Sequence, residues 1–139
     1  TDFLANTPSD ARPNFMQVIG MVKSGRQIIF VAEEKGQIIG HLGGFWRRGQ
    51  KERLKHTMTV GLAVFKAHWG RGIGTAMMEA FEEWAAKNGV HRIGLEVMAH
   101  NKAARALYTK MGYEVEGIKR HSICVNGEYV DEYLMAKLL

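Results

Sequence analysis

The spacing of apolar residues predicts a helix and a pair of strands in the first third of the chain. Residues 1–12 are polar and predict a loop or an edge remnant. Apolar residues recur at helical spacing over roughly 13–24, which predicts a helix that ends at Gly25. Two short apolar runs rich in β-branched residues, 27–32 and 37–46, predict strands joined by a tight turn. The glycines of the second run indicate a bulge or a surface on which another element packs.

The middle of the chain has the pattern strand, glycine-rich turn, helix, strand. The strands are predicted at 57–65 and 91–98, and the amphipathic helix between them at roughly 72–88. Such a unit implies a crossover connection and therefore a parallel pair of strands. A ligand is then expected at the C-terminal end of the first strand, beside the N-terminus of the helix.

The last third predicts one more helix and a long hairpin. Asn101 is expected to start the helix, where it can act as the N-cap, and Gly112 to end it. A strand over 113–125 then reaches Asn126-Gly127, the strongest hairpin signal in the chain. The chain returns over 129–138 as the second strand of this hairpin.

Composition supports one folded domain, residues 1–139, of the α/β class with a mixed sheet. The chain has 139 residues, 46% of them hydrophobic, which is ample for one buried core. No apolar run approaches the roughly 18 residues of a membrane-spanning helix. The single cysteine, Cys124, cannot form an internal disulfide, so we expect a reducing compartment and a cytoplasmic protein. The histidines and this cysteine lack metal-binding spacing, so no metal is expected.

The net charge of +5 favours an anionic partner. The most basic stretch, residues 47–56, fits either a solvated loop or a patch that faces an acidic partner. The other basic residues are dispersed and no recognised DNA- or RNA-binding module is present, so nucleic acid is not expected as a partner. A phosphate-rich cofactor explains the sign of the charge equally well.

The turn between strand and helix carries the clearest candidate chemistry. Gly70, Gly72 and Gly74 stand at every second position, which allows a ligand to approach the backbone closely. Amides at the start of a helix attract anions, and the charge of Arg71 suits phosphate. The turn lacks the lysine of a Walker A loop, and its glycines do not have the spacing of the dinucleotide-binding fingerprint. An ordinary tight turn is the alternative.

Two motifs resemble those of the GNAT N-acetyltransferase superfamily. The first, residues 69–74, resembles the acyl-CoA loop Q/R-x-x-G-x-G/A, with Trp69 in place of Gln or Arg. The second, residues 101–113, matches every fixed place of N-x-x-A-x-x-L-Y-x-K-x-G-F/Y. Residues 127–136 resemble the closing hairpin of the branch that includes the ribosomal-protein N-terminal acetyltransferases. The resemblance covers about residues 27–139.

The resemblance implies the GNAT acyl-CoA N-acyltransferase fold, a central mixed sheet with a β-α-β crossover at the cofactor site. The family usually carries a further strand and helix at its start, and residues 1–26 hold only part of them, so an N-terminal strand is expected to be missing. Acetyl-CoA is the implied cosubstrate, with its diphosphate held by main-chain amides and its pantetheine arm paired with a strand. The residues implied in cofactor binding are Leu62, Ala63, Val64, Trp69, Gly70, Arg71, Gly72, Ile73, Gly74, Thr75, Asn101 and Ala104.

The implied reaction moves the acetyl group to a primary amine of a small molecule, a peptide or a protein N-terminus. The family assigns Tyr108 the role of general acid toward the CoA thiolate, although spacing alone also fits a core tyrosine. An alkylamine has a pKa near ~10.4, so a base must take its proton. By position alone Glu96 is the first candidate and His56 the second, and a surface ion pair is the alternative for Glu96.

A non-catalytic CoA-binding or regulatory module is the alternative function, because such a module could keep the glycine turn. Tyr108 favours the enzyme. The acceptor amine has no transferable motif in this sequence. Many relatives pair, so the resemblance is compatible with a homodimer.

Overall fold

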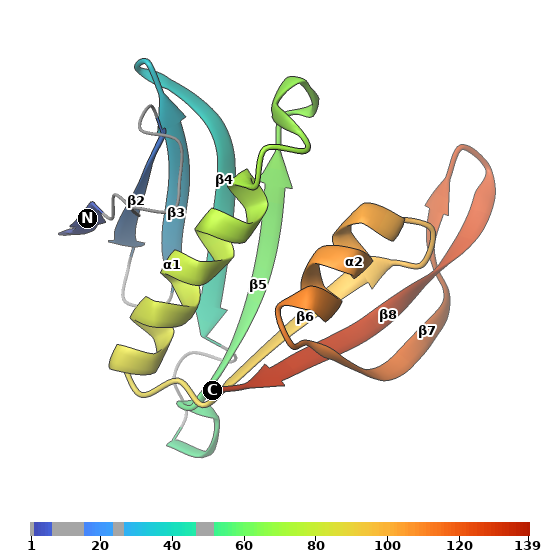
Figure 1. Cartoon of the computed structure of the whole chain (residues 1–139). Helices are drawn as coiled ribbons and strands as arrows, with labels where there is room; N and C mark the ends of the chain where they lie inside the picture. Colours follow the sequence, from blue (N-terminus) through green and yellow to red (C-terminus); the bar gives the residue numbers. More distant parts are fainter. Residues whose placement is uncertain (1, 7–15, 24–26, 47–51) are drawn as a thin grey trace.

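The computed structural model describes residues 2–6, 16–23, 27–46 and 52–139. They form one eight-stranded sheet in the order β1-β2-β3-β4-β5-β6-β8-β7, with two helices on the same face (Figure 1). The strands are β1 (Asp2–Asn6), β2 (Met16–Lys23), β3 (Gln27–Glu34), β4 (Gln37–Trp46), β5 (Thr57–Val64), β6 (Arg92–Met98), β7 (Glu114–Val125) and β8 (Glu128–Leu138). The helices are α1 (Ile73–Lys87) and α2 (Lys102–Lys110), and two 3-10 turns are η2 (Glu52–Leu54) and η3 (Lys66–His68).

The sheet is mixed, as the sequence predicts. Its described strand pairs are antiparallel except β5 and β6, which are parallel and are joined by α1. From residue 27 onward each predicted strand and helix lies within two residues of its observed bounds. The predicted α/β class and the β-α-β crossover are therefore confirmed.

The predicted helix over 13–24 is wrong. Residues 16–23 form β2, which pairs antiparallel with β3 from Met16↔Glu34 to Lys23↔Gln27. An eight-residue apolar run is too short for periodicity to separate helix from strand, and pairing with the edge of β3 decides between them. The predicted end at Gly25 lies outside the described residues. Of the segment predicted as a loop or edge remnant, Asp2–Asn6 is the edge strand β1.

The core lies between α1 and the face of the sheet that this helix covers. Every second residue of β3 is buried there, namely Ile28, Phe30 and Ala32. Phe81 of α1 is fully buried and meets Phe30 edge-on, with 6.3 Å between the ring centroids. Full burial of a large apolar side chain contributes about 1.5–3 kcal/mol, so these contacts fix α1 on the sheet.

Two glycines of β4 lie under α1. A Cβ atom at Gly44 would approach Phe81 Cε1 to 2.5 Å, and one at Gly40 would approach Met77 Cε to 2.9 Å. A side chain at Gly44 would overlap the Phe81 ring, and one at Gly40 would displace the terminal methyl of Met77. The prediction that the glycines of this strand accept a packed element is confirmed, and the register of β3 and β4 also shifts between Ala32 and Glu33.

Both predicted hairpin turns are present. Lys35 and Gly36 have φ values of 50° and 78°, and Asn126 and Gly127 have φ values of 50° and 81°. Positive φ at both central positions is typical of the type I′ turn, which matches the twist of the flanking strands. Within the described residues, no helix is long and apolar enough to cross a membrane.

Replacing Gly44 with alanine is expected to destabilise the fold by about 1–3 kcal/mol, because the added methyl overlaps Phe81 in a packed core. Gly61 of the neighbouring strand β5 is the matched control, since a Cβ atom there meets nothing within 4 Å. Denaturant unfolding should show a large loss for Gly44→Ala and a change within about 0.5 kcal/mol for Gly61→Ala. Equal stability of the two variants would contradict this packing.

Candidate functional site

Strands β5 and β6 separate toward one end of the sheet. Their described pairing runs from Thr57↔Arg92 to Thr59↔Gly94, although β5 continues to Val64 and β6 to Met98. In Figure 1 the two strands diverge, with β5 beside α1 and β6 beside α2. On its other side β5 stays paired with β4 as far as Gly40↔Val64. The edge of β5 that faces the gap therefore offers backbone donors and acceptors to an extended ligand.

The glycine turn follows directly and opens α1. Gly70 and Gly72 have φ values of 77° and 78°, in the left-handed region that glycine tolerates best. Gly72 is the N-cap, so no side chain caps the helix, and the first helical bond runs from the Ala76 N–H to the Gly72 oxygen at 3.0 Å. In the described part of the chain no acceptor is recorded for the amides of Gly70 and of residues 72–75. Such a row of amides at a helix N-terminus attracts anions.

Trp69 fixes the entry to this turn. Its indole Nε1 donates a hydrogen bond to the Val64 oxygen at 2.7 Å, although the residue is 64% exposed. This bond joins the end of β5 to the start of the turn across η3. The tryptophan that replaces Gln or Arg of the motif thus holds the backbone of the turn in place.

Arg71 ties the turn to the β3–β4 hairpin. Its guanidinium pairs with the Glu34 carboxylate and lies 2.8 Å from His68 Nδ1. The hydrogen bond from Arg71 lowers the pKa of the Glu34 carboxyl below its ordinary value. From the sequence, the charge of Arg71 is expected to suit a phosphate ligand. In the structure the Arg71 guanidinium pairs with the Glu34 carboxylate instead. No local signal could identify Glu34, because the two residues are 37 positions apart.

Gly74 sets the distance between the turn and α2. A Cβ atom there would lie 3.2 Å from Leu107 Cδ2 of α2 and 3.3 Å from Leu62 Cδ2 of β5. These contacts are tighter than ordinary van der Waals packing. The third glycine of the motif therefore lets α1, α2 and β5 meet closely, which brings the candidate acid of α2 toward the turn.

Asn101 caps α2 as predicted. Its side-chain Oδ1 accepts a hydrogen bond from the Ala104 N–H at 3.2 Å. Arg105 further anchors the helix, because its Nη1 donates to the Ala99 oxygen at 2.9 Å and its guanidinium lies 4.3 Å from the centre of the Tyr133 ring. The cap and the anchor fix the start of the helix that carries Tyr108.

Tyr108 lies on the buried face of α2. It is 7% exposed, and its hydroxyl forms no hydrogen bond with another described residue. Burial raises the pKa of Tyr108, so the phenol keeps its proton at neutral pH. The centroids of the Tyr108 and Tyr113 rings are 5.9 Å apart. The Tyr113 hydroxyl is buried and has no hydrogen-bond partner among the described residues. Two phenols thus lie in the same region, and only that of Tyr108 is placed by the family motif.

Glu96 lies on the sheet face opposite the helices. Its neighbours Leu95 and Val97 are buried and Glu96 is exposed, as strand alternation predicts. The carboxylate lies 3.2 Å from Lys119 Nζ of β7, which is the ion pair named as the alternative to a catalytic role. Its role as a base stays a prediction.

His56 precedes the other end of β5. Its oxygen accepts the N–H groups of His91 and Arg92, and its ring lies 6.4 Å from that of His91. A strand rises about 3.3 Å per residue, so the length of β5, about 23 Å, separates it from the glycine turn. The role of His56 as the second candidate base also stays a prediction. Of the basic stretch 47–56, residues 47–51 lie outside the described residues, and Lys55 forms an exposed ion pair with Glu52.

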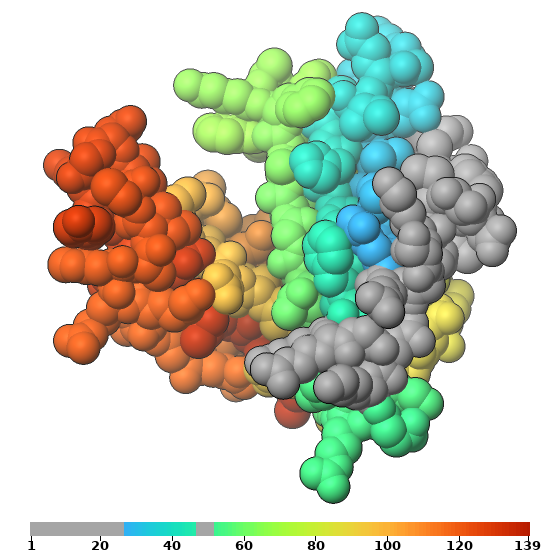
Figure 2. Space-filling view, turned by 180° about the vertical axis from the view of Figure 1, so that it is seen from behind, coloured from blue at the N-terminus to red at the C-terminus, as the bar shows by residue number. Residues whose placement is uncertain are grey.

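The face that carries Glu96 is hollowed. Figure 2 shows this face, with the C-terminal hairpin of β7 and β8 on one side and β4 and β5 on the other. β6 lies between them at the bottom of the hollow. An acceptor molecule in this hollow would reach the gap between β5 and β6 from the side opposite the helices.

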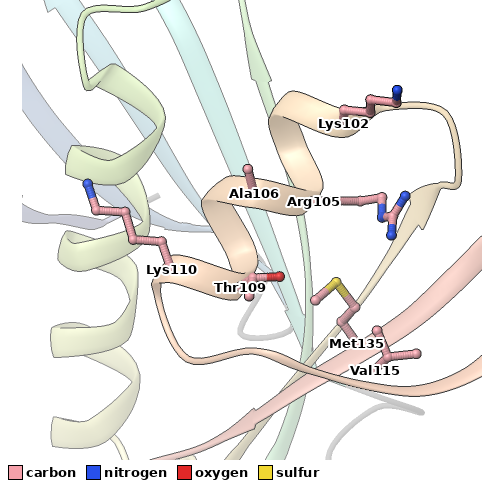
Figure 3. A pocket seen from close by; sticks show the side chains of 7 residues that line it. All are labelled: Lys102, Arg105, Ala106, Thr109, Lys110, Val115 and Met135. Carbon is pink, nitrogen blue, oxygen red and sulfur yellow. The ribbon is translucent and has the colours of Figure 1, made fainter.

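A separate groove of about 600 Å³ lies between α2 and the hairpin. Figure 3 shows its lining, in which cationic side chains surround small and apolar ones. Its residues include Lys102, Arg105, Thr109, Val115 and Met135. These α2 residues lie on the outer side of the helix, whereas Tyr108 lies on the buried side, so the groove is distinct from the glycine turn.

Comparison with known sequences gives one consistent result. The model of the acetyltransferase (GNAT) family matches residues 4–113. The L-amino acid N-acetyltransferase AaaT of Escherichia coli is 35% identical over 107 residues, which are 74% of this chain and 63% of that protein. The chain therefore spans just under two thirds of the length of this relative.

Solved structures share the fold. An acetyltransferase of the GNAT family from Streptococcus pneumoniae has a TM-score of 0.78 and 32% identity, covering 84% of this chain and 70% of that one. The ribosomal-protein-alanine N-acetyltransferase of Brucella melitensis has a TM-score of 0.74 and 27% identity, covering 81% and 69%. The acetyltransferase yncA of Salmonella typhimurium, solved with its cofactor acetyl-CoA, has a TM-score of 0.75 and 22% identity, covering 81% and 65%.

Replacing Glu34 with glutamine should weaken the clamp on the glycine turn and lower Tm by a few degrees at pH 7. Because the pKa of Glu34 is lowered in the folded state, its ionised form stabilises the fold above the ordinary value of 4.5. That stabilisation is lost as the pH falls through the lowered value, so the Tm difference from the unmodified protein should close below pH 4.5. Glu128→Gln, at an exposed site, should leave Tm unchanged. A Tm difference for Glu34→Gln that is the same at pH 3 and pH 7 would contradict the clamp.

Proposed function

Because the chain belongs to the acetyltransferase (GNAT) family, we propose that it transfers the acetyl group of acetyl-CoA to a primary amine. The proposal rests on one observation above all. The uncapped amides of the glycine turn lie beside the edge of β5 that β6 leaves unpaired, and Gly74 lets Leu107, the residue before the motif tyrosine of α2, approach the turn. This arrangement suits a ligand with a diphosphate at one end and an extended amide-bearing arm at the other.

In the proposed complex the amides of residues 70–75 hold the diphosphate. A Cβ atom at Gly70 or Gly72 would meet nothing within 4 Å, so the turn leaves room for phosphate oxygens. The main chain of residues 62–64 pairs with the pantetheine arm in the manner of an added strand. Asn101 and Ala104 line the other side of the arm from the first turn of α2.

The acceptor amine must lose a proton before it attacks. With a pKa near ~10.4, fewer than about one alkylamine molecule in a thousand is neutral at pH 7. Glu96 is the proposed base, directly or through one water, because its exposed side chain is on the strand that borders the gap. The proton passes from the amine nitrogen to this carboxylate and then to solvent.

The neutral amine then attacks the thioester carbonyl. An N–H group of β5 stabilises the oxyanion that forms, since a preorganised donor costs little reorganisation. The carbon–sulfur bond breaks, and the Tyr108 hydroxyl gives its proton to the leaving thiolate. Because burial raises its pKa, the phenol carries its proton at neutral pH and has one to give. The tyrosinate regains a proton from solvent.

The alternative is a module that binds coenzyme A without turnover. The Glu96–Lys119 ion pair favours it, because a paired surface carboxylate needs no catalytic role. An acetyl-CoA consumption assay with small-molecule amines, amino acids and peptides with free N-termini separates the two. Turnover with any acceptor supports the enzyme, and tight coenzyme A binding with no turnover supports the module. The expected homodimer and cytoplasmic location stay predictions.

Tyr108→Phe should lower kcat by on the order of 10²-fold, because the ring stays in place while the thiolate loses its proton donor. Its affinity for coenzyme A, measured by calorimetry, should not change. Tyr113→Phe is the matched control, since it removes a neighbouring buried hydroxyl that has no assigned role and should keep kcat. An unchanged kcat for Tyr108→Phe would remove this residue from the mechanism.

Gly72→Ala should weaken coenzyme A binding at least tenfold. The left-handed conformation of Gly72 orients the amides of the turn, and alanine adopts this conformation poorly. Gly89, at the other end of α1, is a matched control with a φ value of 80° and open space around it. Both substitutions force alanine into the left-handed region and should cost about 1–2 kcal/mol of stability. Calorimetry with coenzyme A should show the loss of affinity for Gly72→Ala alone. Equal dissociation constants for the two variants would contradict the proposed cradle.

A further inference from the structure

Glu132 of β8 is a buried carboxylate without a partner. It is 9% exposed, and it forms no ion pair or hydrogen bond with any other described residue. Glu82 of α1 is equally buried, yet its carboxylate lies 2.5 Å from Lys137 Nζ. A buried ionised carboxylate is unfavourable unless a cation or hydrogen-bond donors compensate it.

The strand register places Glu132 on the hollowed face. It lies directly opposite Met98 of β6 and Lys119 of β7. Met98 and Glu96 share one face of β6, because they are two residues apart in a strand. Tyr133, the next residue of β8, lies on the helix face under the Arg105 guanidinium. Glu132 is therefore on the same sheet face as Glu96, one strand further from the gap.

Two cations on this face are paired with other carboxylates. Lys119, which the register sets opposite Glu132, directs its Nζ to Glu96 Oε2 at 3.2 Å. Arg92 lies on the same face and forms two hydrogen bonds with the Glu116 carboxylate at 2.9 and 2.5 Å. Glu96 and Glu116 are thus each paired with a cation, whereas no ion pair with a described residue is recorded for Glu132. The Glu132 carboxylate oxygens therefore have no recorded donor among the described residues.

We propose that Glu132 binds the acceptor of the transferase reaction by accepting hydrogen bonds from its ammonium group. Glu132 and Glu96 lie diagonally across paired strands, at about 7–8 Å, so one molecule can contact both. In this arrangement the Glu132 carboxylate holds the cation, while Glu96 takes the proton that leaves the nitrogen. The inference rests on the proposed function, and it specifies the substrate class as cationic amines without a carboxylate next to the amino group.

The first test measures acceptor binding with coenzyme A at saturation. Calorimetry with L-alaninamide and L-alanine compares two probes that differ in whether an amide or a carboxylate adjoins the amino group. We expect L-alaninamide to bind at least tenfold more tightly, and Glu132→Gln to weaken its binding at least tenfold. Glu128→Gln, at an exposed site on the same strand, should change neither affinity. Equal affinity for the two probes, no binding of either, or unchanged binding by Glu132→Gln would overturn the inference.

The second test separates binding from structure and from the chemical step. Glu132→Gln should raise KM for the acceptor at least tenfold and keep kcat within threefold of the unmodified protein. The Tm of this variant should be equal or higher, because a buried carboxylate without a partner is removed. A lower Tm together with a loss of coenzyme A affinity would indicate a structural role and overturn the inference.

Failure of the inference is distinguishable from failure of the proposed function. Turnover by the unmodified protein with a KM that does not respond to Glu132→Gln would contradict the inference alone. If the unmodified protein neither binds coenzyme A nor consumes acetyl-CoA, the proposed function fails and the inference with it.

Discussion

The amides at the N-terminus of α1 must find an acceptor, and the local structure of the site follows from this constraint. A side-chain cap would satisfy some of them, but Gly72 occupies the cap position and offers none. The turn is nevertheless held firmly, because Trp69 bonds the end of β5 and Arg71 pairs with Glu34 of the β3–β4 hairpin. The backbone is thus fixed in shape while its donors stay available to an anion.

Close packing carries the consequence of this turn to the rest of the site. Gly74 allows Leu107 of α2 and Leu62 of β5 to approach α1, so α2 stays near the point where β5 and β6 separate. The separation leaves the edge of β5 beyond Thr59 without a β6 partner. Glu96 and Glu132 lie on the sheet face opposite to α2, the helix that carries Tyr108. A cofactor and an acceptor can therefore enter from opposite faces and meet in the gap.

Much of this could be predicted from the sequence, because the signals are local. The glycine spacing, the Asn101 cap and the Asn126-Gly127 turn each depend on a few neighbouring residues. The helix predicted over 13–24 is wrong because a neighbouring strand decides the conformation of a short apolar run. The partner of Arg71 and the burial of Glu132 depend on tertiary pairing, and for Glu132 on a β7–β8 register that shifts at two bulges. No pattern within a single strand contains that information.

The central claim is that the amides of the glycine turn bind the diphosphate of coenzyme A. It is tested most directly by assigned ¹H–¹⁵N NMR spectra during titration with coenzyme A and, separately, with pantetheine, which lacks the diphosphate. The account predicts that the amides of residues 70–75 show the largest shifts with coenzyme A and only small shifts with pantetheine. Saturable coenzyme A binding that leaves these amides unshifted would contradict it.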